Sequence, residues 1–160
     1  MKLFVIQRIN AYWRNNQSQA ILEKLAIFNQ WGQLNYSETG KPFIENGYIS
    51  VSHSNNLLVI AHHTIEIGLD CEYIRPLSNA LIQKLQLDSI NPLLDWCKRE
   101  AIIKLLDDKT YVLKKELIDF HFTEITLDSN FCIVLASKYL VDTYDVIYLD
   151  ENLNTTTPIQ

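Results

Sequence analysis

The apolar residues of this chain change their spacing from strand-like to helix-like and back, and they do so twice. Residues 2–8 have an apolar centre that predicts a first strand, and residues 16–30 carry apolar side chains at helical spacing. Further strands are expected over residues 48–52, 57–63, 66–74, 117–125, 131–137 and 144–149, and a second helix over residues 93–106 with Pro92 in its first turn. This order predicts an α+β fold in which helices pack on a mainly antiparallel sheet.

Polar segments separate these elements and indicate one folding unit. Residues 35–46 contain Gly40 and Pro42 and predict a loop, and Asn55-Asn56 suits a tight turn between two strands. No repeat, low-complexity tract or linker rich in proline and glycine interrupts the chain. We therefore expect one domain over residues 1–150, followed by a polar tail over residues 151–160.

Composition and charge narrow the classes of function. Of the 160 residues, 48% are hydrophobic, which predicts a packed core, and no apolar stretch is long enough to span a bilayer. The formal net charge of -5 argues against broad nucleic-acid binding, which needs clustered positive charge. The three cysteines form no CxxC pair, and the N-terminus lacks the features of a signal peptide. Together these features favour a soluble protein of the reducing cytoplasm.

The G-L-D-C-E segment at residues 68–72 carries two acids on one expected strand. Side chains alternate between the two faces of a strand, so Asp70 and Glu72 point the same way. A divalent cation would relieve the repulsion between two such carboxylates, and oxygen ligands suit magnesium. For this pair alone, the alternative is the exposed acidic face of an ordinary strand.

The second expected helix places Trp96, Glu100 and Lys104 on one stripe, because positions four apart share a helix face. A neighbouring apolar stripe, expected to face the core, contains Leu94, Cys97, Ala101 and Leu105. The alternative for the polar stripe is a solvated helix on which Glu100 and Lys104 form an ordinary ion pair, worth roughly 0.2–0.5 kcal/mol.

Two polar motifs precede these segments. The G-K-P motif at residues 40–42 predicts a turn that presents the positive charge of Lys41. The S-H-S motif at residues 52–54 ends an expected strand with several hydrogen-bond donors, which can hold phosphate oxygens. The alternative is a polar turn with local side-chain caps, and no metal-ligand spacing surrounds His53.

In order along the chain, G-K-P, S-H-S, G-L-D-C-E and W-x-x-[KR]-E-A-x-x-K form a signature that resembles the 4′-phosphopantetheinyl transferase superfamily. The likeness covers residues 40–104 and is greatest to the surfactin-synthetase-activating type, in the branch with a W…KEA helix. The resemblance implies an enzyme that moves 4′-phosphopantetheine from coenzyme A to a serine of an acyl, peptidyl or polyketide carrier protein. It also implies an abbreviated pseudo-dimer, with a short first half at about residues 1–60 and a second half at about residues 61–150. The single D-x-E pair and single KEA helix favour a monomer with one site, and a homo-oligomer is the alternative.

The resemblance assigns cofactor roles to several side chains. Asp70, Glu72 and Glu100 would hold Mg²⁺, or alternatively Mn²⁺, against the pyrophosphate of coenzyme A. The remaining residues assigned to the cofactor are Lys41 and Pro42 near the nucleotide, and Ser52 and His53 on phosphate. Arg99 stands where the family usually has lysine, and it keeps the positive charge for the cofactor.

The resemblance also implies the catalytic groups. Glu100, directly or through a metal-bound water, would take the proton of the carrier serine. Lys104 would stabilise the charge that builds on the leaving phosphate. Because only 39 residues precede Gly40, few basic residues are left for the 3′-phosphate of coenzyme A, and Arg14 is the candidate.

Two other hypotheses stay open. The short N-terminal part would also suit a non-catalytic relative that binds a carrier protein or a nucleotide. A generic α+β domain would require the order of the motifs to be accidental. The apolar residues between 81 and 87 would form either a helix that docks the carrier protein or ordinary core; they are Leu81, Ile82, Leu85 and Leu87.

Overall fold

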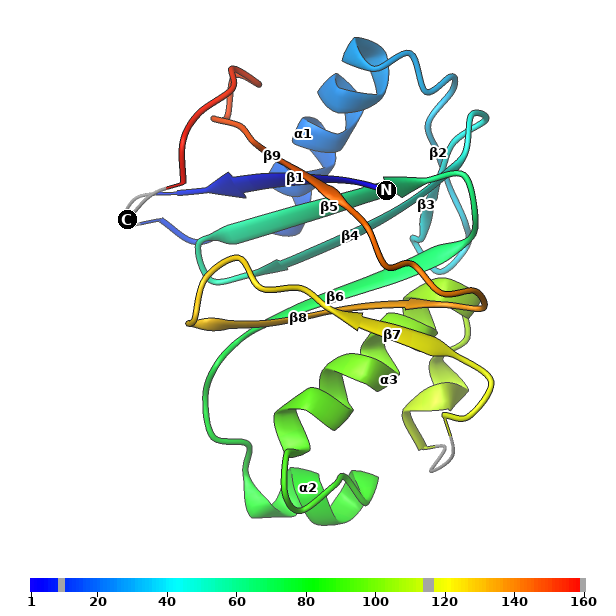
Figure 1. Cartoon of the computed structure of the whole chain (residues 1–160), viewed down its shortest axis with the longest axis vertical. Coiled ribbons are helices and arrows are strands. Elements are labelled where there is room, and N and C mark those ends of the chain that lie inside the picture. The colour runs from blue at the N-terminus through cyan, green and yellow to red at the C-terminus, as the bar shows by residue number, and fades with distance from the viewer. Residues whose placement is uncertain (9–10, 114–116, 159–160) are drawn as a thin grey trace.

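The computed structural model describes residues 1–8, 11–113 and 117–158, and Figure 1 shows its elements. The strands are β1 (Lys2–Gln7), β2 (Asn35–Tyr36), β3 (Pro42–Phe43), β4 (Tyr48–Ser54), β5 (Leu57–His63), β6 (Ile67–Tyr73), β7 (His121–Glu124), β8 (Phe131–Ser137) and β9 (Asp145–Tyr148). The helices are α1 (Asn15–Phe28), α2 (Asn79–Leu85) and α3 (Pro92–Leu106), with a 3-10 helix, η1, at Lys109–Leu113. The predicted α+β class is confirmed.

Two sheets lie between the two long helices. The first sheet has the order β4-β5-β1-β9 and carries α1 on its outer face, and the second has the order β6-β8-β7 and carries α3 (Figure 1). Among the described strands, every pairing is antiparallel except that of β1 with β9, which is parallel. Strand β9, from the C-terminal part of the chain, therefore lies at an edge of the sheet that β1 begins.

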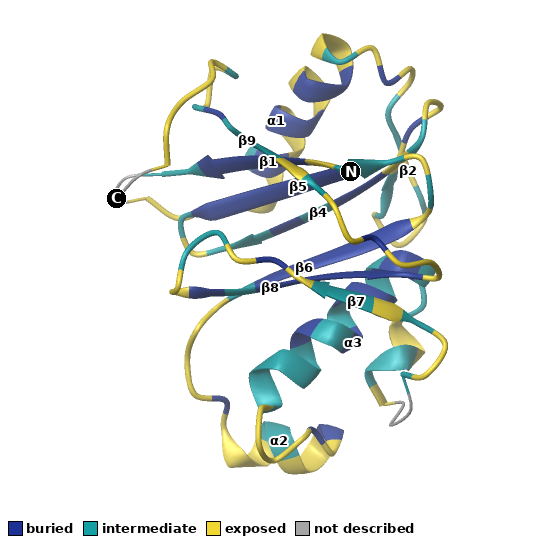
Figure 2. Ribbon diagram, viewed as in Figure 1, coloured by how far each residue is buried: buried dark blue, intermediate teal, exposed yellow. Residues whose placement is uncertain are grey.

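The alternation of apolar side chains along the strands separates the cores. On β1, Leu3 and Val5 face the core shared by the two sheets, whereas Phe4 and Ile6 face α1. Strands β1 and β5 are thus buried on both faces, as Figure 2 shows. A third core lies under α3 and contains Cys97, Ala101, Ile102, Leu105, Val134 and Ala136, which confirms the predicted apolar stripe of this helix.

The two sheets are joined along β4 and β6 by serine side chains. Hydroxyl groups at alternate positions of β4 accept hydrogen bonds from backbone N–H groups of β6, because alternate side chains leave a strand on one face. The pairs are Ser50 with Leu69 at 2.8 Å, Ser52 with Cys71 at 3.0 Å, and Ser54 with Tyr73 at 2.9 Å. This serine row satisfies the free edge of β6. It also fixes the position of β4 relative to the acids of β6.

Helix α3 begins and ends where local sequence signals place it. Pro92 occupies its first turn, and the side chain of Asn91 accepts a hydrogen bond from the N–H of Leu94 at 3.3 Å. The helix ends at Asp107, which adopts a left-handed conformation with φ of 57°. The predicted helix over residues 93–106 is therefore confirmed to within one residue.

Two expectations from the sequence need adjustment. The predicted loop over residues 35–46 contains the small β2–β3 hairpin, and the predicted strand over residues 117–125 is shortened to β7. In the α2 region, Leu85 and Leu87 are buried in a cluster with Leu77, which favours the core alternative for these two, whereas Leu81 and Ile82 are only partly buried. Of the predicted polar tail, residues 159–160 lie outside the described residues. In the part of the chain that is described, no helix is both long and apolar enough to cross a bilayer.

Candidate functional site

Helix α3 packs directly against β6 at Gly68. A Cβ atom at this position would lie 2.0 Å from the carbonyl oxygen of Ala101 and 2.5 Å from the backbone nitrogen of Leu105. Because no side chain fits in this space, glycine permits the close approach of strand and helix. The approach brings Lys104 of α3 against Asp70, two residues beyond Gly68 on the strand.

Asp70, Lys104 and Ser52 form a triangle of polar contacts at this junction. The Asp70 carboxylate is buried, and its Oδ1 accepts hydrogen bonds from Lys104 Nζ at 2.8 Å and from the Ser52 hydroxyl at 3.1 Å. Lys104 Nζ also donates to Ser52 Oγ at 2.8 Å. The other carboxylate oxygen, Oδ2 of Asp70, is buried and has no hydrogen-bond partner among the described residues. Such an atom calls for an ion or a water molecule.

Glu72 lies on the same face of β6 as Asp70 and is half-buried. Its Oε1 accepts a long hydrogen bond from the indole nitrogen of Trp96 at 3.4 Å, and its Oε2 lies 3.9 Å from the guanidinium of Arg75. Burial raises the pKa of Glu72, and the charge of Asp70 raises it further, whereas Trp96, Arg75 and Lys104 act in the opposite direction.

Glu100 is electrostatically linked to the acids of β6. Burial raises the pKa of Glu100, the charge of Asp70 adds to this effect, Lys104 opposes it, and Glu72 adds to it again. The three carboxylates therefore repel one another, and Lys104 is the cation that attracts each of them. A further cation at this place would lower the repulsion.

His53 lies at the end of β4 beside the same cluster. Its Nε2 lies 2.9 Å from Oδ1 of Asn15, at the first turn of α1. Burial lowers the pKa of His53, and the charge of Lys104 lowers it further, so the imidazole is neutral at pH 7. His53 can therefore donate or accept a hydrogen bond here, but it adds no positive charge.

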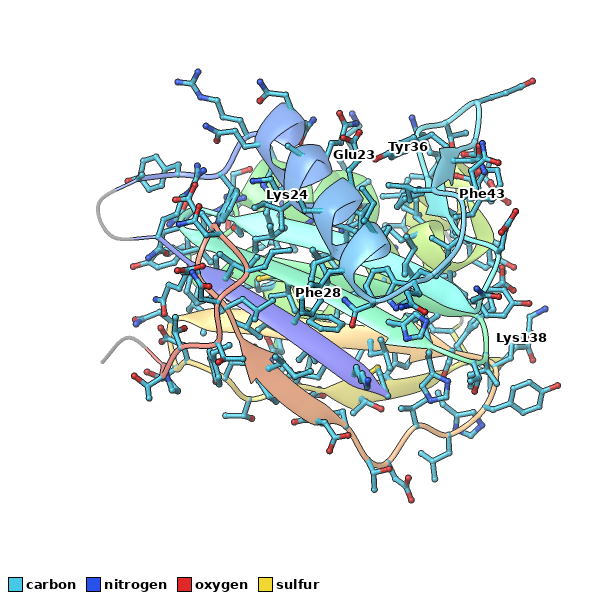
Figure 3. The ribbon with its side chains drawn as sticks, turned by 90° about the horizontal axis from the view of Figure 1, so that it is seen from above. Glu23, Lys24, Phe28, Tyr36, Phe43 and Lys138 are labelled. Carbon is cyan, nitrogen blue, oxygen red and sulfur yellow. The ribbon has the colours of Figure 1, made fainter. Side chains whose placement is uncertain are left out.

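Two adjoining cavities meet at Lys104. The larger, of about 490 Å³, is lined by Ser52, His53, Asp70 and Glu72, and the smaller, of about 230 Å³, by Lys41 and Glu100; Pro42 and Lys104 line both. Walls of the larger cavity come from α1 and from the β2–β3 hairpin, where Tyr36, labelled in Figure 3, lies beside the helix. Among the described residues, no three side chains of histidine, cysteine, aspartate or glutamate are gathered closely enough to hold a metal ion.

Lys41 has a structural contact at the smaller cavity. Its Nζ donates to the carbonyl oxygen of Leu105 at 2.6 Å and lies 3.6 Å from Glu66 Oε1. A cation at the last carbonyl groups of a helix satisfies those groups and is favoured by the helix dipole. Lys41 thus binds the C-terminal end of α3.

The structure does not bring Arg99 and Arg14 to these cavities. Arg99 is 2% exposed, and its guanidinium is held by both carboxylate oxygens of Asp95 and by backbone carbonyl groups. Those carbonyl groups belong to Leu85, Gln86 and Val112. Arg99 therefore ties α2 and η1 to α3. Arg14 is exposed immediately before α1 and lines neither cavity.

Sequence reasoning missed the residues that the first part of the chain adds to the larger cavity. Asn15, Gln19 and Leu22 line it from one face of α1, and Thr39 lines it from the hairpin segment. The spacing of the α1 residues follows the i, i+4, i+7 pattern of a helix face. That spacing alone does not identify which face of the helix borders a cavity, because this depends on how the helix packs against the rest of the fold.

A larger cavity, of about 590 Å³, lies at the N-terminal end of α3, and no residue predicted for the site lines it. Its lining is more apolar and includes Leu77, Leu93, Ile125 and Phe131. We place the candidate site at the two cavities beside Lys104, and not at this one, because the predicted side chains lie there. The chain matches no model of a known protein family and no curated protein.

Proposed function

We propose that this protein transfers the 4′-phosphopantetheine group of coenzyme A to a serine hydroxyl of a carrier protein. In this reaction a bond forms between the serine oxygen and the β-phosphorus of coenzyme A. The bond from that phosphorus to the oxygen of 3′,5′-ADP breaks, and the serine loses its proton to a base. The proposal takes the resemblance of the four motifs as its starting point.

One observation carries the proposal: residues of four separate motifs meet around Lys104. Ser52 and Asp70 contact its ammonium directly, Glu100 precedes it by one helical turn, and Pro42 lines the same two cavities. A generic domain gives no reason for this convergence. The arrangement of two sheets, each covered by one helix, also suits the abbreviated pseudo-dimer that the resemblance implies.

The chemistry of the three acids suits a hard divalent cation, although their side chains are not gathered closely enough in this arrangement to hold one. The unpartnered Oδ2 of Asp70 and the mutual repulsion of the three acids both favour a positive ion with oxygen ligands. Asp70, Glu72 and Glu100 would hold Mg²⁺ or Mn²⁺, after side-chain adjustments that bring Glu100 to the acids of β6. When bound, such an ion neutralises charge on pyrophosphate and stabilises the leaving phosphate.

The remaining groups divide the work of the reaction. Glu100 would take the proton of the serine, directly or through a metal-bound water. Lys104 provides the positive charge for the leaving phosphate. His53, neutral at pH 7, lies on the wall formed by β4, where it would offer a hydrogen bond to a phosphate oxygen. Ser52 lies on the same wall and would donate to phosphate only after its one hydroxyl proton leaves Asp70.

A second candidate function, a non-catalytic binder of a carrier protein or nucleotide, is favoured by one feature. Among the described residues that line the cavity of about 490 Å³, Lys104 is the single lysine or arginine, and it is already paired with Asp70. Without a metal ion, the cavity therefore offers little positive charge to a coenzyme with several phosphate groups.

Transfer of mass to a carrier protein distinguishes the two candidates. The full chain is incubated with coenzyme A, Mg²⁺ and apo forms of fatty-acid, polyketide and nonribosomal-peptide carriers, and each carrier is weighed by mass spectrometry. The transferase gives at least one carrier the mass of one phosphopantetheine group, and Glu100→Gln abolishes the gain. Glu23→Gln is the matched control, because Glu23 is an exposed residue of α1 (Figure 3), and we expect this variant to keep activity. No gain on any carrier would favour the binder.

A further inference from the structure

We propose that Lys104 is a resident counter-ion that competes with a divalent cation for Asp70, so that the ammonium holds the ligand-free site together and weakens metal binding. The inference rests on the proposed function in one respect, which is that Asp70 is a ligand of the cation. It goes beyond that function because it gives Lys104 a second role, in the state that precedes substrate binding.

The contacts of Lys104 are those of a counter-ion to Asp70. Its ammonium lies 2.8 Å from both Asp70 Oδ1 and Ser52 Oγ, and its charge acts through space on Glu72 and Glu100. No other lysine or arginine among the described residues is placed within salt-bridge distance of Asp70. The one positive charge of Lys104 thus serves three carboxylates.

The two partners of this ion pair differ in their freedom to leave. The side chain of Asp70 is 6% exposed, whereas that of Lys104 is 29% exposed and reaches the site from a cavity wall. Lysine has four rotatable side-chain bonds and strongly prefers hydration, so its ammonium can turn into the cavity. Asp70 is fixed by the strand, and Lys104 is the partner that moves.

The positive charge of Lys104 should weaken the binding of a divalent cation to Asp70. A divalent cation placed on Asp70 lies within a few ångströms of the ammonium, and like charges at that distance repel strongly where water is scarce. Removal of the ammonium charge removes this repulsion and leaves the acids without a counter-ion. Metal binding then becomes tighter, whereas the metal-free protein becomes less stable.

The experiment measures Mn²⁺ binding to the metal-free full chain by isothermal titration calorimetry. Lys104→Gln keeps a hydrogen-bond donor for Asp70 and Ser52 but loses the charge, and we expect it to bind Mn²⁺ at least about tenfold more tightly than wild type. Lys98→Gln is the matched control. Lys98 lies on the same helix with 27% of its side chain exposed, and it pairs with Glu124 at 3.6 Å. The control keeps wild-type affinity.

Two further readouts make the result decisive. Thermal unfolding of metal-free Lys104→Gln occurs at a lower temperature than that of wild type, and Mn²⁺ raises the unfolding temperature more in the variant. The double variant Asp70→Asn with Lys104→Gln loses the tighter binding, because the contested carboxylate is gone. Should Lys104→Gln fail to fold without metal, Lys104→Arg, which keeps the charge, must bind Mn²⁺ no more tightly than wild type.

Equal or weaker Mn²⁺ binding by Lys104→Gln overturns the inference, as does an equal gain in Lys98→Gln or the absence of Mn²⁺ binding by all variants. These outcomes differ from failure of the proposed function. Wild-type protein that modifies a carrier while Lys104→Gln shows no gain in Mn²⁺ affinity leaves the transferase standing and removes the counter-ion role. If the wild-type protein modifies no carrier but Lys104→Gln binds Mn²⁺ more tightly, the counter-ion role stands and the transferase proposal falls.

Discussion

The ammonium of Lys104 lies 2.8 Å from Oδ1 of Asp70, and this contact joins the last turns of α3 to the centre of β6. The two residues are far apart in the sequence and meet because Gly68 lets the helix approach the strand. The contact places a helix motif and a strand motif at the edge of one cavity.

Enlarging Gly68 should separate the helix from the strand. Gly68→Ala places a Cβ atom 2.0 Å from the carbonyl oxygen of Ala101, so α3 must shift, and we expect the free energy of unfolding to fall by about 1–3 kcal/mol. Urea unfolding followed by circular dichroism measures this change. Gly40→Ala is the comparison, because its Cβ meets no atom within 4 Å and only its positive φ is strained. Equal losses in both variants would contradict a packing role for Gly68.

The serine row allows the site contacts of Ser52 to be separated from its structural contact. Ser50→Ala leaves one N–H of β6 without its partner, which lowers the free energy of unfolding by about 1–3 kcal/mol. Ser52→Ala loses the equivalent bond and also the contacts with Asp70 and Lys104. We expect its loss to exceed that of Ser50→Ala by about 1 kcal/mol, measured by chemical denaturation. A smaller loss in Ser52→Ala would show that the triangle stabilises nothing.

The pH dependence of the stability of Glu100→Gln tests the electrostatic repulsion between Glu100 and the acids of β6. Burial and the charge of Asp70 raise the pKa of Glu100 above its ordinary value of 4.5, so the folded protein holds this proton more tightly than the unfolded chain does. Ionisation above the folded pKa therefore lowers the free energy of unfolding. In metal-free protein at pH 7, Glu100→Gln should be more stable than wild type by up to about 1 kcal/mol, because partial exposure screens the effect.

The advantage of Glu100→Gln should shrink as the pH falls through the folded pKa and vanish below 4.5. Urea unfolding at a series of pH values measures it, and the exposed variant Glu23→Gln should show no such trend. A gap that widens as the pH falls would mean that Glu100 is stabilised as a carboxylate in the folded protein.

Replacement of Arg99 should destabilise the fold strongly, whereas replacement of Arg14 should not. Arg99→Met removes a buried guanidinium from Asp95 and three carbonyl groups, and we expect the free energy of unfolding to fall by about 3–5 kcal/mol. Arg14→Met, at an exposed position, should change it by less than about 0.5 kcal/mol. Thermal and chemical unfolding check both values. A rise in the KM for coenzyme A in Arg14→Met, with stability unchanged, would support its predicted role at the 3′-phosphate.

The periodic parts of the fold were predictable, because long apolar stripes and proline or asparagine at a helix start act locally. Helix α3, with Pro92 in its first turn, and the tight turn at Asn55-Asn56 are examples. The β2–β3 hairpin was missed because each of its strands has two residues, too few to show alternation within a polar segment. The shortened β7 shows the complementary error, since an apolar run can pack on a core without pairing as a strand.

Local geometry predicted which acids share a face, but not where the cations of the candidate site lie. The alternation of a strand puts Asp70 and Glu72 on one face, and helical spacing puts Glu100 with Lys104, both from local geometry. Where a long basic side chain ends depends on tertiary contacts that no spacing encodes. Arg99 turns to backbone carbonyl groups around it, and Lys41 turns to the end of α3. For the same reason, the sequence did not indicate that Lys104 would lie on Asp70 itself.

A crystal structure of the protein with Mn²⁺ and coenzyme A, examined by anomalous scattering at the manganese edge, tests the proposed site most directly. We expect one manganese peak bound by carboxylate oxygens of Asp70, Glu72 and Glu100, with Lys104 turned from Asp70 to the pyrophosphate. An occupied coenzyme with no manganese at these acids, and with Lys104 still seated on Asp70, would contradict it.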